Sequence, residues 1–260
     1  MKISLSKWTL AAIISLATAT AAQSPLAGSW KFNAEKSQLT GDTIQFTPAS
    51  EGMVRVTSGG QSYSFKPDGS DTTTPMGYTA QWEKVDDQTW KQTVMNGSTK
   101  LSENTYTLSG DGKTITLTSE GTKPNGEKFN DSFTYTRMSG TNGFMGNWKS
   151  TKVDLKSFSG YEFKDNGDGA LVWSLPDYHA TVTIKTDGKD YPATGPTVPE
   201  GLTLSLTKTG PRTFTMVQKM NGKPIYKATE TVSADGKTLE EVGSAVGVNE
   251  TATTIYEKID

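Results

Sequence analysis

Apolar and polar residues alternate along most of the chain. Ile115 and Leu117 are flanked by threonines, and Val182 and Ile184 show the same pattern in the second half. A period of two places alternate side chains on opposite faces of a strand, which predicts antiparallel strands with one buried face. Asp-Gly and Asn-Gly pairs separate these segments and tolerate the positive φ angles of tight hairpins. We expect about nine strands in each half, and no pattern predicts an amphipathic helix.

Short motifs recur in the same order in the two halves. The Gly-x-Trp motif at 28–30 returns at 146–148, an offset of 118, and Met-Asn-Gly at 95–97 returns at 220–222, an offset of 125. Several such matches that keep both order and spacing indicate a tandem repeat. The Gly-rich segment 139–143 lies between the copies and is typical of a linker.

The predicted fold is all-β, with two tandem antiparallel up-and-down β-barrels at residues 26–138 and 144–260. Many short strands with one apolar face must either close on themselves or stack in two layers. A closed barrel removes exposed sheet edges, and β-sandwiches are the alternative. Each copy is expected to close its own sheet.

The first 22 residues have a different composition. Lys2 and Lys7 precede an apolar run from 8 to 17, and small residues follow as far as Ala22. This order predicts a secretory signal peptide over residues 1–22, and hence a secreted or periplasmic protein. The run is short for a bilayer, which needs about 20 apolar residues, and no later run is longer, so no membrane span is expected.

Charge and residue content argue against most enzyme classes. Loss of Lys2 and Lys7 changes the formal net charge from −2 to −4, which does not favour nucleic-acid binding. The chain has no cysteine and one histidine, His179, which is expected to point outward. The segment 165–169 fits a turn better than a calcium loop. No catalytic residue, metal site or cofactor motif is predicted, so we do not expect an enzyme.

Each copy opens with Gly-x-Trp and ends with an aromatic and a basic residue. This pattern resembles that of lipocalins and wider calycins, and the segments 187–195 and 233–238 resemble secreted bacterial lipocalin-like tandem-repeat proteins of unassigned function. The resemblance implies that a basic side chain from the last strand of each copy packs over its first-strand tryptophan and seals the barrel floor. The floor residues would be Gly28, Trp30 and Arg137 in one copy, and Gly146, Trp148 and Lys258 in the other.

The inward aromatic and aliphatic residues are the candidates for ligand contact. A small barrel interior is either packed or just wide enough for one small ligand. Two loops, 68–77 and 187–201, either rim a barrel mouth or are surface insertions. The candidates are Tyr63, Phe65, Trp82, Trp90, Trp173, Val182, Ile184 and Tyr191.

Two functions are favoured by this pattern, and an enzyme with a carboxylate-based site at a barrel mouth ranks third. The first is an extracytoplasmic protein that binds a small hydrophobic or amphipathic ligand inside a barrel. The second is a non-enzymatic envelope or surface module with solid barrels that serves a structural or partner-binding role. A hollow interior would favour the first, and a packed interior would favour the second.

Overall fold

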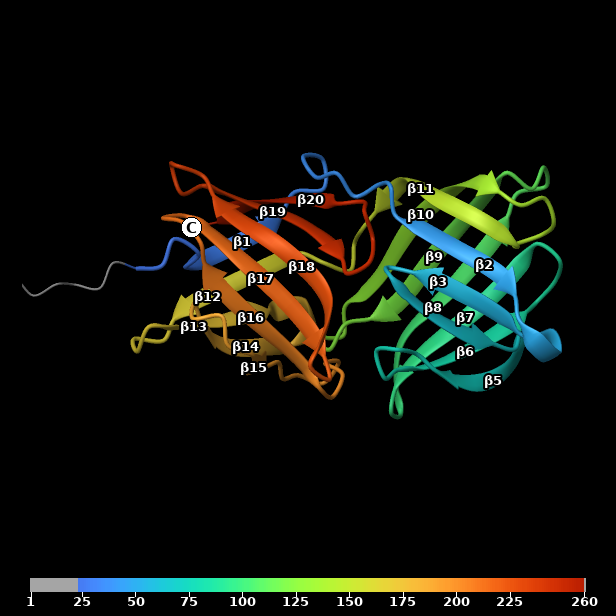
Figure 1. Ribbon diagram of the computed structural model, residues 1–260, viewed down its shortest axis with the longest axis horizontal. Helices are drawn as coiled ribbons and strands as arrows, with labels where there is room; N and C mark the ends of the chain where they lie inside the picture. Colours follow the sequence, from blue (N-terminus) through green and yellow to red (C-terminus); the bar gives the residue numbers. More distant parts are fainter. Residues whose placement is uncertain (1–22, 260) are drawn as a thin grey trace, which may run out of the picture.

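The computed structural model describes residues 23–259, so the predicted signal peptide at 1–22 lies outside the described residues. Two barrels of antiparallel strands lie end to end along the long axis of the molecule (Figure 1). The prediction of an all-β fold with two barrels is confirmed. Among residues 23–259, no helix is long and apolar enough to cross a membrane.

One ten-stranded sheet, here called barrel 1, has the strand order β4-β3-β2-β11-β10-β9-β8-β7-β6-β5. Its strands are β2 (Thr43–Pro48), β3 (Val54–Ser58), β4 (Gln61–Phe65), β5 (Asp68–Thr73), β6 (Thr79–Lys84), β7 (Thr89–Asn96), β8 (Thr99–Leu108), β9 (Thr114–Thr122), β10 (Lys128–Ser139) and β11 (Gly146–Asp154).

The other ten-stranded sheet, barrel 2, has the order β14-β13-β12-β1-β20-β19-β18-β17-β16-β15. Its strands are β1 (Gly28–Phe32), β12 (Gly160–Asp165), β13 (Ala170–Leu175), β14 (Ala180–Lys185), β15 (Tyr191–Pro192), β16 (Leu202–Lys208), β17 (Thr213–Met220), β18 (Lys223–Val232), β19 (Thr238–Ala245) and β20 (Ala252–Ile259). Two single-turn 3₁₀ helices, η1 (Ser50–Gly52) and η2 (Pro176–Tyr178), complete the described structure.

The two repeats exchange their opening strands. In Figure 1 the blue β1 lies among the orange and red strands of barrel 2, where it pairs with β12 and β20. The corresponding strand of the second repeat, β11, pairs with β2 and β10 in barrel 1. The expectation that each half closes its own sheet is therefore wrong for one strand in each barrel. The expected ranges 26–138 and 144–260 do not coincide with the two sheets.

The two barrels differ in how they close. In barrel 2, Thr181 of β14 and Thr194 exchange two backbone hydrogen bonds of 2.8 Å, and β15 next to Thr194 pairs with β16. In barrel 1, the end strands β4 and β5 are not paired with each other in the described residues. The loop 187–201 thus completes barrel 2, whereas the segment 68–77 contributes the end strand β5 of barrel 1.

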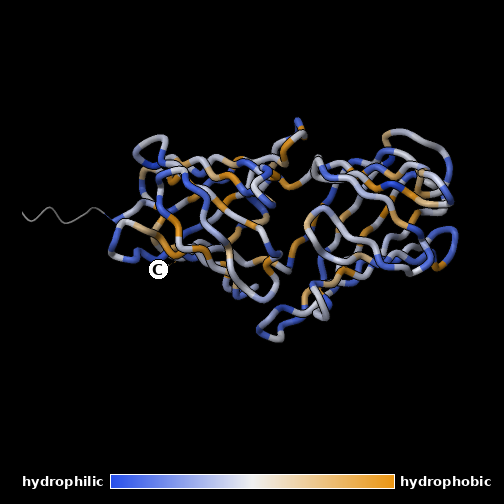
Figure 2. Tube along the Cα trace, turned by 60° about the horizontal axis from the view of Figure 1, so that its bottom comes forward, coloured by the Kyte–Doolittle hydropathy of each residue, from blue (hydrophilic) through white to orange (hydrophobic). Residues whose placement is uncertain are grey.

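Each barrel has its own apolar core, which follows the sheets rather than the repeats. Orange and blue alternate along the strands in Figure 2, and the loops are mostly blue. Leu26 and Trp30 pack in the core of barrel 2, whereas Phe144 and Trp148 pack in the core of barrel 1. Burial of these side chains, at about 1.5–3 kcal/mol each, stabilises both barrels and holds each exchanged strand in place.

Both barrel floors contain the predicted cation over an indole ring, but with the partners exchanged. The Arg137 guanidinium lies 4.0 Å from the ring centre of Trp148, and the Lys258 ammonium lies 5.3 Å from that of Trp30. The resemblance implied that each cation would cover the tryptophan of its own repeat. Strand exchange places Arg137 over the tryptophan of the second repeat, and Lys258 over that of the first.

Glycine is required at the start of both opening strands. Gly28 and Gly146 have φ angles of 133° and 139°, which side chains rarely adopt. A Cβ atom at Gly28 would lie 2.4 Å from Lys258 Cε, and one at Gly146 would lie 2.1 Å from the carbonyl oxygen of Ser139. The Gly-x-Trp motif therefore combines a close backbone approach with a buried indole at each floor.

Candidate functional site

The two barrels meet at the ends opposite their floors. Asn96, the last residue of β7 in barrel 1, donates to the carbonyl oxygen of Pro196 in barrel 2, and the Tyr78 hydroxyl donates to that of Thr197. The β3–β4 turn lies against the β19–β20 loop, so close that a Cβ atom at Gly60 would lie 2.3 Å from the Val246 carbonyl oxygen. The mouth of each barrel is thus turned towards the other barrel.

A buried ion pair joins the two barrels at this junction. Lys123 of barrel 1 donates to Asp177 of η2 at 2.9 Å, and their side chains are 3% and 9% exposed. Burial opposes the ionisation of Asp177, but hydrogen bonds from Ser159 and Lys123 hold its pKa below the ordinary value. A buried pair of this kind fixes geometry, because removing one partner leaves an uncompensated charge.

A cavity of about 810 Å³ lies at the junction, within the range typical of small-molecule sites. We call it the junction cavity. Barrel 1 contributes turns at its mouth, and barrel 2 contributes the inner wall near its mouth and the loop 196–199. Its apolar lining includes Tyr78, Leu101 and Phe129 from barrel 1, and Trp173, Leu175, Val182, Val198, Leu202 and Leu204 from barrel 2.

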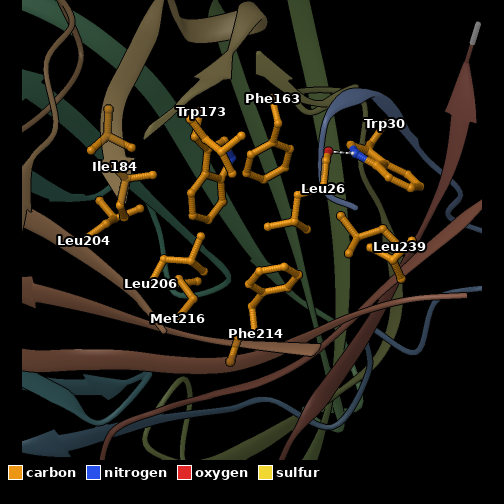
Figure 3. Packing of buried hydrophobic residues seen from close by; sticks show 14 of the residues in the cluster. Leu26, Trp30, Phe163, Trp173, Ile184, Leu204, Leu206, Phe214, Met216 and Leu239 are labelled. Atoms are coloured by element: carbon orange, nitrogen blue, oxygen red, sulfur yellow. Dashed lines mark hydrogen bonds between the residues drawn. The ribbon is translucent and has the colours of Figure 1, made fainter. Parts of the chain in front are cut away.

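The cavity extends into barrel 2 because the wall there consists of aliphatic residues and one tryptophan. In Figure 3, Trp173, Leu204 and Leu206 point towards one another, and Trp30 lies at the floor, where its Nε1 donates to Leu26. Trp173 lines the cavity and is 2% exposed, and its Nε1 has no hydrogen-bond partner among the described residues. A buried donor without an acceptor is unfavourable by about 1–3 kcal/mol.

Barrel 1 is filled instead of hollow in its floor half. The rings of Phe65 and Trp82 are stacked at 4.2 Å, and Trp90 stacks on Phe144 at 4.6 Å. Phe46 contacts these rings edge to face. Three of the predicted ligand contacts, Phe65, Trp82 and Trp90, thus lie in a packed aromatic core.

A hydrogen-bond network lies nearer the mouth of barrel 1. The Tyr63 hydroxyl accepts from Trp82 Nε1 at 3.1 Å and from Gln92 at 2.9 Å, and Asn104 donates to Gln92 at 2.7 Å. Burial raises the pKa of Tyr63. Tyr63, also a predicted ligand contact, is engaged in this network and does not line the junction cavity.

The structure brings two of the predicted contacts, Trp173 and Val182, together in the junction cavity. Ile184 is fully buried deeper in barrel 2. Tyr191 packs against the outer part of that core and donates to Asp187 at 3.1 Å, outside the cavity. His179 is exposed, as expected, and lies at the cavity rim.

Barrel 2 also buries two carboxyl groups on its inner wall. Glu230 of β18 and Glu241 of β19 are directly opposite each other and are 1% and 5% exposed. Glu241 accepts hydrogen bonds from Tyr226 at 2.7 Å and Tyr161 at 3.4 Å, whereas neither carboxyl oxygen of Glu230 has a partner among the described residues. Burial is the main cause that raises the pKa of Glu230 well above its ordinary value, and the charge of Glu241 is the second cause.

Glu241 faces a second opening between the barrels, and Glu230 lies behind it without lining that opening. An opening of about 370 Å³ is lined by Tyr161, Tyr226 and Glu241, and it shares Gln218 with the junction cavity. No ion pair found among residues 23–259 includes Glu230 or Glu241. We call this region, from Glu230 to the opening, the acidic pocket.

The carboxyl pair was not identified from the sequence, although a signal was present. Glu230 follows Ala228 and precedes Val232 at alternate positions, and Glu241 follows Leu239 in the same way. A charged residue on the apolar face of a strand is exceptional, because burying an unpaired charge is unfavourable. Lys123 and Asp177 gave no such signal, since their pairing depends on how the barrels meet.

Comparison with protein families, with curated proteins and with solved structures gave no match. Within the described residues, no three or more His, Asp or Glu side chains are grouped as a metal site.

Proposed function

We propose that this protein is an exported, non-enzymatic binding protein that holds a small hydrophobic or amphipathic ligand. The observation that carries the proposal is the junction cavity of about 810 Å³ with its apolar lining. Apolar pockets of this size bury most of the surface of a small ligand, and transfer of that surface from water favours binding. The ligand is expected between the barrels and within the mouth of barrel 2.

Two features support a ligand of mixed polarity. The cavity wall is largely hydrocarbon, but Gln218, Lys100 and His179 also line it. The indole N–H of Trp173 is buried without a partner. A few polar groups in an apolar site commonly orient the bound molecule. A hydrocarbon chain with one polar end fits this arrangement.

The test is binding of N-phenyl-1-naphthylamine, a neutral hydrophobe that fluoresces in apolar surroundings. We expect saturable binding to the purified protein, and a loss of affinity of about tenfold in Val182→Phe, because the added ring occupies the cavity. Thr183→Phe is the matched control, since the neighbouring side chain is on the exposed face of the same strand. No saturable binding, or equal binding by both variants, would contradict the proposal.

The alternative is a structural or partner-binding module of the envelope or surface. The packed aromatic interior of barrel 1 favours it, because stacked rings fill the floor half of that barrel. A protein that binds no hydrophobe in the assay above, yet unfolds cooperatively, would favour this alternative.

A further inference from the structure

The acidic pocket contains two buried carboxyl groups, and no basic residue lines its opening. Glu230 and Glu241 lie side by side on the inner wall, Glu230 with both oxygens unpartnered. Carboxyl groups buried in proteins are normally paired with a cation or with hydrogen-bond donors. Here the donors present are the hydroxyls of Tyr226 and Tyr161, and both of them are directed at Glu241.

Further acidic residues lie near the opening beside Glu241. Asp42 and Glu250 lie at the adjoining junction surface, which also includes Tyr226. Partial burial is the main cause that raises the pKa of Asp42, and the charge of Glu250 is the second cause. The residues that line the acidic opening include no Lys, Arg or His. A concave site with acidic residues and low-dielectric walls concentrates cations.

Gly243 allows the Tyr226 hydroxyl to approach Glu241 closely. Gly243 is next to Glu241 on the inner face of β19, and a Cβ atom there would lie 2.1 Å from the Tyr226 hydroxyl oxygen. The absence of a side chain at Gly243 lets Tyr226 reach Glu241 from the mouth side. Along β18, Tyr226 precedes Glu230, so the carboxyl pair lies deeper in the barrel than this tyrosine.

We propose that the Glu230–Glu241 pair binds the ammonium group of an amphiphilic amine whose hydrocarbon portion lies in the junction cavity. This inference rests on the proposed function, and it names the class of ligand. An ammonium group has three N–H donors, which two carboxyl groups and a tyrosine hydroxyl can accept. Tyr161 and Tyr256, whose rings lie 4.9 Å apart beside the pair, offer aromatic faces to the same cation.

An organic cation fits the pocket better than a metal ion. Calcium takes six to eight oxygen ligands, and magnesium requires near-octahedral coordination. The described residues provide two carboxyl groups at this point, in a wall that is otherwise aromatic and apolar. Gln218 borders both the acidic opening and the junction cavity, so the two spaces adjoin at this side chain.

The test compares ligands that have the same chain and different heads. Dodecylamine and dodecanoate, below their micellar concentrations, and dodecanol, below its solubility limit, would be titrated at pH 7 to displace N-phenyl-1-naphthylamine. We expect dodecylamine to bind at least about tenfold more tightly than dodecanol, because a charge-assisted contact is added, and dodecanoate to bind most weakly.

Matched variants assign that preference to the acidic pocket. Glu241→Gln should lower the affinity for dodecylamine to about that for dodecanol, with dodecanol binding unchanged as the sign of an intact fold. Glu240→Gln is the control, since it removes a neighbouring exposed carboxylate from the same strand. It should retain the full preference for the amine.

The outcomes separate this inference from the proposed function. If none of the three compounds binds, both fail. If all three bind equally, or if Glu241→Gln retains the amine preference, the amine site is wrong while the hydrophobic cavity stands. Calcium binding by calorimetry that is lost in Glu241→Gln, without any amine preference, would likewise overturn the amine assignment.

Discussion

The two barrels contain the same repeat but have different interiors. Trp82 of barrel 1 and Leu206 of barrel 2 occupy equivalent positions in the repeat. Trp82 is paired with Gln92 on the next strand, and Leu206 is paired with Met216, the residue equivalent to Gln92. The larger indole stacks on Phe65, whereas the smaller Leu206 is buried two residues beyond Leu204, which lines the junction cavity. One difference in side-chain volume therefore helps to separate a solid barrel from a hollow one.

The same comparison applies to the buried acids. Tyr106 and Leu117 of barrel 1 stand where Glu230 and Glu241 stand in barrel 2, since the neighbouring Leu108 and Val232 align in the repeat. In barrel 1 the side chains at these positions pack in the aromatic core, and the ring centres of Tyr106 and Trp82 lie 5.1 Å apart. The floors and turns maintain the shared fold, and the inner walls are free to differ. Binding chemistry is therefore expected in barrel 2.

The largest expected effect separates the packed wall from the open one. Trp82→Ala should lower the free energy of unfolding by about 3–5 kcal/mol, because the cavity it leaves is enclosed by aromatic rings. Trp173→Ala should lower it by less than about half of that amount, since Trp173 already borders an open space and its N–H is unpartnered. Urea unfolding of both variants measures the difference, and equal losses would mean that the two interiors are packed alike.

A smaller effect distinguishes the two floors. Arg137 donates to the carbonyl oxygens of Gly112, Met145 and Gly143, and Arg137→Ala should destabilise the protein by about 2–3 kcal/mol. Lys258 makes no side-chain hydrogen bond within the described residues, and Lys258→Ala should lower stability by at most about 1 kcal/mol. Thermal unfolding of both variants at the same pH measures which one is less stable. A larger loss of stability in Lys258→Ala than in Arg137→Ala would contradict this prediction.

The buried acids predict a pH dependence that barrel 1 lacks. Because the folded state raises the pKa of Glu230 above the 4.5 of the unfolded chain, the folded state holds a proton that the unfolded state loses. Stability then falls as the pH rises above about 4.5, by up to about 1.4 kcal/mol per pH unit, until the folded pKa is reached.

Glu230→Gln removes this titration without changing the shape of the side chain. The variant should therefore gain stability over the wild type, with a larger gain at pH 8 than at pH 5. Glu240→Gln, which changes an exposed residue of β19, should show no such trend. If the difference in the free energy of unfolding between Glu230→Gln and the wild type were the same at pH 5 and pH 8, Glu230 would be ionised in the folded protein throughout this range.

Much of the fold could be predicted from local patterns. Alternation at Ile115 and Leu117 identified strands, and the repeated Gly-x-Trp motif identified both barrel floors. The exchange of β1 and β11 could not be predicted, because the two copies of the opening strand have the same pattern and fit either sheet. Which copy is used depends on the chain crossings at 33–42 and 155–159.

The site was predicted only in part, for a similar reason. Trp173 and Val182 line the cavity, but Phe65 and Trp82 have equally inward, equally apolar positions and are packed instead. Whether an inward residue faces a space depends on the volumes opposite it in three dimensions. The walls supplied by the loop 196–199 and by Phe129 exist only because the barrel mouths meet.

The central claim is that the repeats exchange their opening strands within one chain and so hold the two mouths together. The cysteine-free chain allows a direct test with pairs of introduced cysteines. Lys31 is directly opposite Glu257 in the structure, and Thr136 is the residue equivalent to Glu257 in barrel 1, where it faces Lys149. Opposed positions on antiparallel strands are close enough for a disulfide.

Oxidation of Lys31→Cys/Glu257→Cys should give an intramolecular disulfide in the monomer, whereas Lys31→Cys/Thr136→Cys should stay reduced. Mass spectrometry of the oxidised proteins separates these results from cross-linked dimers. A disulfide that forms between positions 31 and 136 and not between 31 and 257 would show that each repeat keeps its own opening strand, and would contradict this account.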